Sequence, residues 1–409
     1  MLHQSLLEQA QTIGDQIVAL RRAIHAEPEL GLDTPRTLAK VRAALADLPL
    51  EWRTGPSTSG AVAILKGTAG PGSQSGARTV LLRGDMDALQ MPEETGLEFA
   101  SQVPNTMHAC GHDAHTAMLA GAARLLAARR DQLHGEVRFM FQPGEEGFHG
   151  AKFMLADGLL GGTGDYRLPE AAFALHVMPN ARHGQVAGRT GALMASADQF
   201  EVVVTGRGGH AALPHMALDP VPVACEIVTA LQALVARQFD THDPVVVTVT
   251  QLDAGTAHNI IPDFARLRGT LRTLSPHHRD KIHAALERLA KGIADAHGAS
   301  AAVTLTPGFP VTVCDARAVA LAEAVSSDLF GDSAFHRLAQ PMMGAEDFSY
   351  VLEKIPGAML FLGVAHEGVD WHKCPAIHSP RMMIDESALP RGAALLAGCA
   401  SRFLEQGWD

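Results

Sequence analysis

Short apolar runs that end in polar residues alternate with a helical pattern in the first half of the chain. Three runs predict buried strands, namely "TVLLRGD" at 79–85, "EVRFMFQ" at 136–142 and "AAFALHV" at 171–177. A helical pattern covers 113–130, and Asp113 stands where an N-cap is expected. Strands and helices at this spacing predict an α/β fold with a mostly parallel sheet.

The segment 195–307 has a different pattern. Alternating apolar positions predict strands and two amphipathic stretches predict helices, in the βαββαβ order of a ferredoxin-like domain. The predicted strands are 199–206, 244–252, 265–274 and 301–307, and the predicted helices are 218–239 and 276–298. The α/β pattern then returns, with helices near 316–330 and 387–405 and a strand at 357–364. We therefore expect a discontinuous domain, 1–194 with 308–409, into which a smaller domain, 195–307, is inserted.

The remaining segments predict neither a targeting signal nor a membrane anchor. The first 30 residues have the pattern of one amphipathic helix, with Leu6, Ile13, Ile17 and Leu20 near one face, and lack the features of a signal peptide. No run of about 18 apolar residues is present, so no transmembrane helix is expected. The Gly/Ser-rich stretch 67–77 is expected to be a flexible loop.

Composition narrows the classes of partner. Of the 409 residues, 47% are hydrophobic and 19% charged, which is typical of a folded globular protein. The net charge of −11 argues against nucleic acid and anionic membranes as partners, because both require a basic surface. The five cysteines are scattered and odd in number, so no disulfide framework is implied and a reducing, cytoplasmic location is expected.

Polar side chains gather where the predicted strands end. Asp85 and Asp87 close the first strand, Glu145 and Glu146 follow the second, and His176 lies at the end of the third. Ligands of open α/β sheets bind at the carboxyl ends of the strands. These side chains are therefore expected along one edge of the sheet.

Two further segments belong to the same edge. "MHACGHDAH", at 107–115, precedes the helix between the first two strands, and His378 follows the last strand. The combined donor set is one thiol, three imidazoles and one carboxylate, from Cys110, His112, Glu146, His176 and His378. Since this is one donor more than a tetrahedral single-metal site takes, it favours a dinuclear site with a bridging ligand. A thiolate between two cations stays deprotonated, which makes Cys110 a ligand rather than a nucleophile.

Each of these residues also has a structural interpretation. A lone cysteine is most often a buried thiol, and a histidine or glutamate can be a core or solvated residue. The convergence on one edge is what those interpretations leave unexplained. Adjacent Glu145 and Glu146 suit two roles, one as a metal ligand and the other as a general base.

The chain resembles a family of metal-dependent amidohydrolases that includes hippurate hydrolase, bacterial N-acyl-L-amino-acid amidohydrolases and plant hydrolases of indoleacetyl–amino acid conjugates. These enzymes are related to glutamate carboxypeptidase-like and aminoacylase-like metallopeptidases. The motifs that carry the resemblance are "RRAIHAEPELG", "RGDMDALQMPEETG", "MHACGHDAHTAMLAGAA", "FQPGEEG", "GGHAALPH", "HNIIPD", "MGAEDFSY" and "IHSPRMMID". They run over most of the chain, and in this order they are specific to the family but not to a substrate.

The resemblance implies roles for residues of the first domain. The metal ligands fall on Cys110, His112, Glu146, His176 and His378, with Cys110 as the bridge, and the general base falls on Glu145. Asp87 would be a carboxylate that orients the ligands. Asp85 stands where the wider superfamily uses a histidine ligand, and His112 would supply the missing imidazole.

The resemblance also implies a role for the inserted domain. This domain would be a dimerisation or lid domain, so a homodimer or a higher homo-oligomer is expected. His210 would stabilise the oxyanion from the partner subunit, and Asn259 and Arg272 would hold the free carboxylate of the substrate.

The predicted function is metal-dependent hydrolysis of an N-acyl amino acid to a carboxylic acid and a free amino acid. Two divalent ions per chain are expected, zinc first, although the mixed donor set also accepts manganese, cobalt or nickel. Three alternatives stay open: a dipeptidase or carboxypeptidase on the same scaffold, a non-catalytic metal-binding or substrate-binding homologue, and a redox-sensing thiol protein using Cys110 and Cys374. The second would lack the base, yet Glu145 is present.

Overall fold

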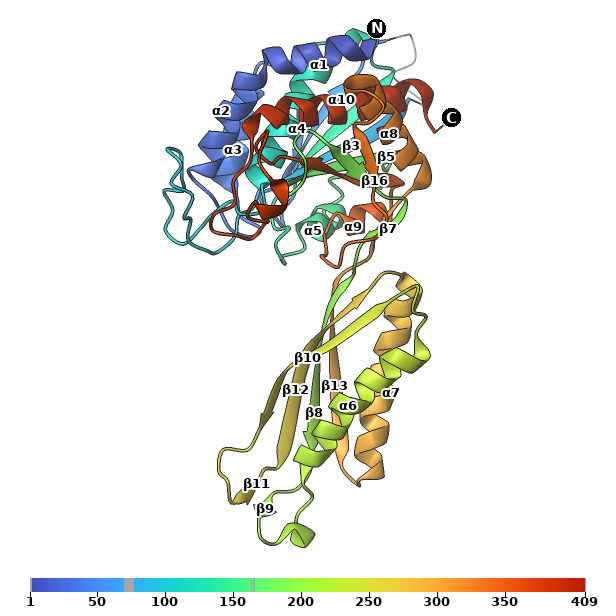
Figure 1. Ribbon diagram of the computed structural model, residues 1–409. Coiled ribbons are helices and arrows are strands. Elements are labelled where there is room, and N and C mark those ends of the chain that lie inside the picture. Colours follow the sequence, from blue (N-terminus) through green and yellow to red (C-terminus); the bar gives the residue numbers. More distant parts are fainter. Residues whose placement is uncertain (1, 70–76, 163, 165, 409) are drawn as a thin grey trace. The chain divides into compact units, whose positions relative to one another are not determined.

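The computed structural model describes residues 2–69, 77–162, 164 and 166–408, which form two compact units (Figure 1). Unit 1 consists of Met1–Leu193, Val313–Gln340 and Asp347–Asp409. Unit 2 consists of Met194–Thr312 and Pro341–Glu346, and it contains the segment expected to be inserted. Most of the loop expected at 67–77 lies outside the described residues.

Unit 1 is built on an eight-stranded sheet with the strand order β1-β2-β4-β3-β5-β16-β6-β15. The neighbours β4, β3, β5 and β16 are parallel, which confirms the predicted mostly parallel α/β fold. At the sides, β1, β2 and β6 pair antiparallel to their inner neighbours. The strands are β1 Glu51–Thr54, β2 Ala61–Lys66, β3 Arg78–Asp85, β4 Gly135–Gln142, β5 Ala171–Met178, β6 Val186–Gly188, β15 Phe335–Arg337 and β16 Gly357–Gly363.

Helices cover both faces of this sheet. Figure 1 shows α4 and α10 on one face and α5 and α9 on the other. The apolar strands fit this arrangement, because Leu81, Leu82, Phe139, Phe141 and Phe173 are fully buried between two helical layers. The helices are α1 Leu2–Thr12, α2 Gly14–His25, α3 Pro35–Ala44, α4 His112–Ala127, α5 Gly150–Ala156, α8 Ala316–Phe330, α9 Ser349–Leu352 and α10 Leu389–Gln406, with 3₁₀ turns η1 Arg130–Gln132, η3 Trp371–Lys373 and η4 Glu386–Ala388.

Two predictions about helix ends were wrong. The N-terminal pattern forms two helices, which meet at Ile13 and Gly14, instead of one. Glycine is a weak helix former, and the open side of Gly14 lies against the ring of Pro390. Asp113 is not an N-cap, because α4 begins at His112 and Gly111 occupies the cap position. The Asp113 carboxylate is instead fully buried and paired with other side chains.

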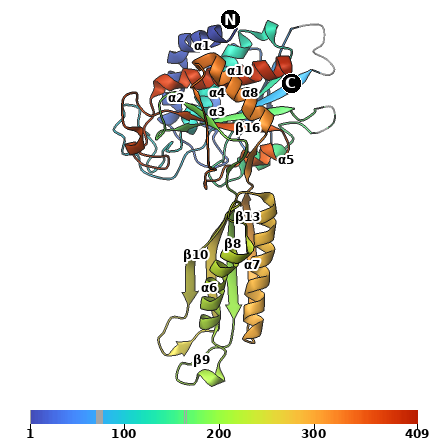
Figure 2. The ribbon, with the colours of Figure 1, turned by 45° about the vertical axis from the view of Figure 1, so that its right-hand side comes forward.

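Unit 2 has the predicted βαββαβ order, completed by a short two-stranded ribbon. Its four-stranded sheet has the order β10-β12-β8-β13, with every neighbouring pair antiparallel. Helices α6 and α7 pack on one face of this sheet (Figure 2), and the other face is largely polar. The elements are β8 Ala197–Thr205, β9 Gly209–His210, η2 Pro214–Met216, α6 Pro220–Gln238, β10 Val245–Ala254, β11 Ile260–Ile261, β12 Phe264–Thr273, α7 Pro276–Ala296 and β13 Ser300–Phe309, while β7 Gly191–Met194 and β14 Thr312–Cys314 lie at the chain crossings between the units.

Helix α6 is, by length and composition, the one helix among the described residues that could cross a membrane. Its apolar stripe of Val223, Ile227, Leu231 and Leu234 is, however, buried in the core of unit 2. Core helices of this kind meet the same criterion, so the helix is weak support for a membrane location.

Candidate metal centre

The five predicted ligands converge in unit 1 as two groups that share one sulfur atom. Cys110, His112 and His176 form one group, and Cys110, Glu146 and His378 form the other. Within each group the donor atoms lie within 4.8 Å of one another. This arrangement gives Cys110 the position of a bridge between two sites.

Backbone geometry explains why a glycine separates Cys110 from His112. Gly111 has a φ of 86° and directly precedes α4. A Cβ atom at this position would lie 2.3 Å from Cγ2 of Val177 on strand β5. Only glycine combines the left-handed conformation with this close approach to the strand.

Hydrogen bonds fix the orientation of His176. Its Nδ1–H donates to the carbonyl of Val177 at 2.7 Å, which leaves Nε2 facing Cys110 Sγ at 3.4 Å. Burial, together with the neighbouring His115, holds the pKa of His176 well below its ordinary value. The imidazole is therefore neutral and presents a lone pair on Nε2, as a metal ligand requires.

The late ligand, His378, is tied to the same loop. Its backbone N–H donates to the carbonyl of Ala109 at 2.7 Å, and its φ of 64° is in the left-handed region. The ring Nε2 lies 3.3 Å from Glu146 Oε1. A chain segment more than 260 residues downstream is thereby fixed beside Cys110.

Asp87 holds the loop that carries both glutamates. Its Oδ1 accepts the backbone N–H of Glu145 and its Oδ2 accepts that of Glu146, both at 3.0 Å. The same carboxylate lies 3.5 Å from Nδ1 of His112. Glu145 itself is buried, and its Oε2 lies 3.9 Å from Nε2 of His112.

Several buried polar atoms of this cluster lack hydrogen-bond partners among the described residues. They are both ring nitrogens of His112 and Oε1 of Glu146. Buried polar atoms without partners are costly, so such atoms call for an explanation. A soft thiolate with imidazoles and a carboxylate is a donor set that suits divalent transition metals, and cations there would use the lone pairs of one His112 ring nitrogen and of the Glu146 oxygen. The residues therefore fit the predicted metal centre.

A further cluster, Asp85 with His112 and His115, also has donor atoms within 4.8 Å of one another. His115, however, donates from Nδ1 to Asp85 Oδ1 at 2.7 Å and accepts the Val177 N–H on Nε2 at 2.9 Å. The second oxygen of Asp85 is paired with Arg83. Both ring nitrogens of His115 are thus occupied, so it supports the ligand-bearing strands instead of binding metal. No role was predicted for His115, although its spacing of one helical turn from His112 was a usable signal.

The candidates of unit 2 occupy two opposite ends of its sheet. His210 and Asn259 lie together and exposed at the β9–β11 ribbon, where His210 pairs with Ile260 and the Asn259 carbonyl accepts the Ala211 N–H at 3.1 Å. Strand β12 begins at Phe264, its end closest to the ribbon, and Arg272 lies about eight residues further along, near the other end. At about 3.3 Å per residue this is a separation of roughly 25 Å. The two residues predicted to hold one carboxylate are therefore not brought together within one chain.

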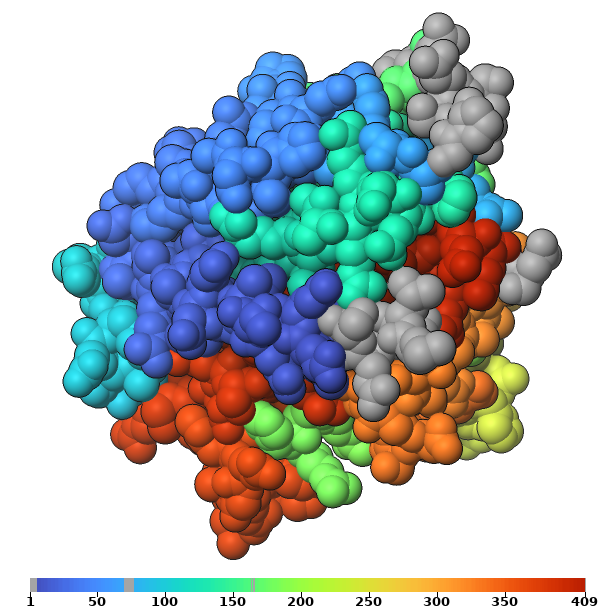
Figure 3. Space-filling view, turned by 90° about the horizontal axis from the view of Figure 1, so that it is seen from above, coloured from blue at the N-terminus to red at the C-terminus, as the bar shows by residue number. Residues whose placement is uncertain are grey.

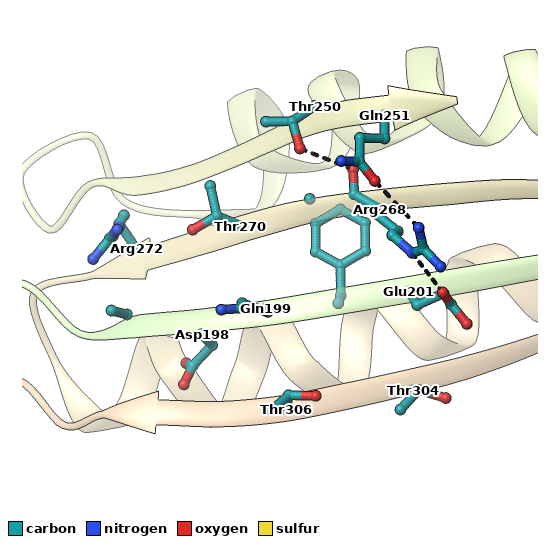
Figure 4. A pocket seen from close by; sticks show the side chains of 13 residues that line it. Asp198, Gln199, Glu201, Thr250, Gln251, Arg268, Thr270, Arg272, Thr304 and Thr306 are labelled. Carbon is teal, nitrogen blue, oxygen red and sulfur yellow. Dashed lines mark hydrogen bonds and ion pairs between the residues drawn. The ribbon is translucent and has the colours of Figure 1, made fainter. Parts of the chain in front are cut away.

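Arg272 lines a polar pocket of about 580 Å³ on the open face of the unit 2 sheet (Figure 4). Arg268, on the same strand face, donates from Nε to Glu201 at 2.7 Å. Among the described residues, no hydrogen bond or ion pair engages the half-buried guanidinium of Arg272, and burial lowers its pKa. Arg272 is therefore available for an anionic group, whereas Arg268 is not.

Comparison with known proteins places the whole chain in one family. The profile of Peptidase family M20/M25/M40 matches residues 81–402. IAA-amino acid hydrolase ILR1-like 2 of Arabidopsis thaliana is 38% identical over 99% of this chain and 89% of its own length. N-acetylcysteine deacetylase of Bacillus subtilis is 37% identical over 95% and 97%, and thermostable carboxypeptidase 1 of Saccharolobus solfataricus is 37% identical over 98% and 99%.

The fold has a matching solved structure. The crystal structure of the YXEP protein of Bacillus subtilis, a dinuclear metal-binding peptidase of family M20, superposes with a TM-score of 0.82. The two chains are 33% identical, with 97% of this chain and 99% of the other covered. The similarity extends over both units.

Proposed function

Because the chain belongs to Peptidase family M20/M25/M40 and is thus a hydrolase of amide bonds, we propose that it binds two divalent cations and hydrolyses N-acyl amino acids. The products are a carboxylic acid and a free amino acid. The observation that carries this proposal is the pair of donor groups that share Cys110. One group supplies His112 and His176, and the other supplies Glu146 and His378.

The chemistry divides between the cations and the chain. When bound, the cations act as Lewis acids that polarise the scissile carbonyl and lower the pKa of the attacking water. Glu145 accepts the proton of that water and passes it to the leaving amine, which a buried carboxylate at this position is placed to do. Asp87 accepts the backbone N–H of Glu145 and so holds the loop from which the base projects.

Unit 2 supplies the recognition of the substrate in this proposal. The unpaired guanidinium of Arg272 binds the free carboxylate of the amino acid, and His210 stabilises the oxyanion. His210 and Asn259 lie at the opposite end of the sheet from Arg272, so one active site would draw them from two subunits of a homodimer. We propose zinc as the cation, with manganese, cobalt or nickel as alternatives, and a cytoplasmic location.

A carboxypeptidase is the second candidate, because thermostable carboxypeptidase 1 is about as similar to this chain as the deacetylase is. The two activities share the cations and the base, and they differ in whether the acyl side carries a free amino group.

Cys374 is half-buried, and burial raises the pKa of the Cys110 thiol. A low-pKa thiol is expected of a redox sensor, so this observation does not favour that alternative.

A substrate panel with metal removal tests the proposal. Chelator-treated protein should lose hydrolysis of N-acetyl, N-benzoyl or indoleacetyl amino acids and regain it with divalent ions. Metal analysis should give about two ions per chain. Faster hydrolysis of unblocked dipeptides would establish the peptidase instead, and full activity with one ion would exclude the dinuclear site.

Two variants separate ligand from base. Glu145→Gln should keep both ions and lose several orders of magnitude in kcat, because base and proton donor are lost together. Cys110→Ala should lose metal. Full metal content and full rate in the Cys110 variant would refute the bridging role.

A further inference from the structure

The motif "RRAIHAEPELG" contains two side chains, those of Arg21 and His25, that the proposed mechanism does not use. Arg21 and His25 lie in the last turns of α2 and are both buried. Arg21 Nε donates to Asp113 Oδ2 at 2.7 Å, and His25 Nδ1 lies 2.7 Å from the same oxygen. Asp113 is fully buried and immediately follows His112. The end of α2 is thus joined to the first turn of α4, which carries a proposed ligand.

His25 bridges two carboxylates. Its Nδ1 faces Asp113, and its Nε2 lies 3.2 Å from Glu93 Oε1. Neutral imidazole has only one N–H, so two such hydrogen bonds require the imidazolium form. Burial and the guanidinium of Arg21, whose Nη2 lies 3.2 Å from Nδ1, oppose a charge here, but the two carboxylates outweigh them and raise the pKa of His25. The nearby ring of His108 adds no positive charge, because burial lowers its pKa to about 3.

Arg21 extends this network to the segment that follows His378. Its Nη1 donates to Glu386 Oε1 at 3.1 Å. A backbone hydrogen bond of 2.8 Å from Glu94 to Pro380 joins the same segment to the loop of Glu93. In Figure 3, cyan and red-orange parts of the chain lie next to the dark blue N-terminal helices on one face of unit 1.

This network reaches two segments that carry proposed ligands. His112 and Asp113 are the first two residues of one helix. Fixing the Asp113 side chain therefore also fixes the backbone position from which the His112 side chain projects. Cys110 is only three residues from Asp113. The network is buried, and buried charges with several fixed partners restrict their neighbours more than surface pairs do.

We propose that His25 and Arg21 are positioning residues, which act through Asp113 to hold the turn of Cys110 and His112 in the geometry that binds the cations. This inference rests on the proposed metal centre. Removing a group that is hydrogen-bonded to a metal ligand typically lowers metal affinity by about 10–100-fold, and His25 acts one step further out, through Asp113. The loss of His25 should therefore weaken cation binding without removing any ligand.

The test compares His25→Gln with a matched variant in unit 2. There His283 lies 2.9 Å from the buried carboxylate of Asp198, which Arg279 also binds at 2.7 Å. This trio has the same chemistry as Asp113 with Arg21 and His25, but unit 2 contains none of the five proposed ligands. His283→Gln is thus a control for the general effect of losing a histidine from a buried ion pair.

Cobalt(II) binding to the full-length apoprotein is the readout, measured by chelator competition and by the thiolate-to-cobalt absorption band of Cys110. We expect His25→Gln to bind cobalt about 10-fold more weakly, the low end of the range for direct partners of ligands, with an altered band, while His283→Gln keeps wild-type binding. Thermal unfolding of each apoprotein reports stability separately. Wild-type cobalt affinity and an unchanged band in folded His25→Gln would overturn the proposal, whatever its stability.

A milder variant covers the case in which His25→Gln does not fold. Glu93→Gln replaces one of the two carboxylates that face His25 with a neutral side chain of the same shape. It should also weaken cobalt binding, by a smaller factor than His25→Gln does. Unchanged binding in this variant would then overturn the proposal. If the wild-type chain binds two cobalt ions and no panel substrate is hydrolysed, the proposed function fails and the positioning role is still tested.

Discussion

At the scale of single residues, Gly111 is the position where the metal centre depends most directly on backbone geometry. In Gly111→Ala, the added Cβ would meet Val177 Cγ2 at 2.3 Å and would occupy a φ of 86°. We expect a loss of about 2–4 kcal/mol in the free energy of unfolding, from the left-handed conformation and the overpacking together. Metal content should fall with it, because the clash displaces the turn between two proposed ligands. Denaturant unfolding and metal analysis measure both effects.

The chain offers a matched control for this variant. Gly298, two residues after the end of α7, has a φ of 71°, and no atom lies within 4 Å of its added Cβ. Gly298→Ala should therefore lose only the conformational part, about 1–2 kcal/mol, and keep its metal. Equal losses of stability and metal in the two variants would mean that the contact with Val177 is unimportant.

Glu93 gives a prediction about pH. Burial raises its pKa, but hydrogen bonds from His25, Thr95 and the Ser101 backbone more than offset this and lower the pKa to about 2, against an ordinary 4.5. A folded-state pKa below the unfolded value gives stability that is complete above about pH 4.5 and is lost as the pH falls towards 2. The difference in unfolding free energy between wild type and Glu93→Gln should shrink over this window. A difference that stays constant from pH 6 to pH 3 would contradict the assigned partners.

At the scale of elements, strand β12 shows how alternation sorts chemically similar residues. Arg268 and Arg272 share its polar face, yet Arg268 is paired with Glu201 and Arg272 is not paired among the described residues. Arg272→Ala should lower kcat/KM for N-acyl amino acids by about one to two decades, the value of a charge-assisted hydrogen bond. The corresponding amides, which lack the carboxylate, should be affected little.

Arg268→Ala is the control for this comparison. It removes a guanidinium from the same face of the strand, but one that is already paired with Glu201 and so is not available to a substrate. Its kcat/KM should stay near the wild-type value on both substrate types. If Arg272→Ala lowered the rates on acids and amides equally, Arg272 would support the fold and the carboxylate would need another partner.

Long elements with regular patterns were predictable from the sequence, and those that depend on distant contacts were not. The predicted strands at 79–85 and 171–177 agree with β3 and β5 within one residue, because their apolar runs reflect burial on both faces. The break between α1 and α2 falls where Gly14 lies against Pro390, and the buried Asp113 is paired with Arg21, 92 residues away. No local pattern encodes such contacts, so both positions were predicted wrongly.

The candidate site was predictable for the same topological reason. Parallel strands bring their carboxyl ends to one edge, so residues that end successive strands can be expected to meet. This expectation holds for Glu146 and His176, which lie at the ends of β4 and β5 and each share a donor group with Cys110, just before α4. It gives no information about His210 and Asn259. They lie at a short ribbon of unit 2, and its two-residue strands are too short to produce a recognisable strand pattern in the sequence.

At the scale of the whole molecule, the open question is whether one active site needs two chains. His210 and Asn259 lie at one end of the unit 2 sheet, and Arg272 lies at the other, roughly 25 Å away along β12. An N-acyl amino acid is much shorter than this distance. A single substrate can therefore contact both ends of the sheet only if two copies of unit 2 contribute to one site.

Mixing two inactive chains tests this composite site. His210→Ala lacks the proposed oxyanion donor and Glu145→Gln lacks the proposed base, so each homodimer should be nearly inactive. In a mixed dimer, one site receives an intact Glu145 from one chain and an intact His210 from the other. After random exchange about half of the dimers are mixed, so recovery of roughly a quarter of the wild-type activity is expected from the symmetry of the dimer.

The control mixes Glu145→Gln with Cys110→Ala, whose lesions both lie in unit 1 and leave no intact site. Subunit exchange is verified independently, by mass spectrometry of differently tagged chains. If exchange is complete and the first mixture recovers no more activity than the control, His210 acts within its own chain or outside catalysis, and a separate contact must explain how the carboxylate-binding end and the His210 end of the sheet serve one substrate.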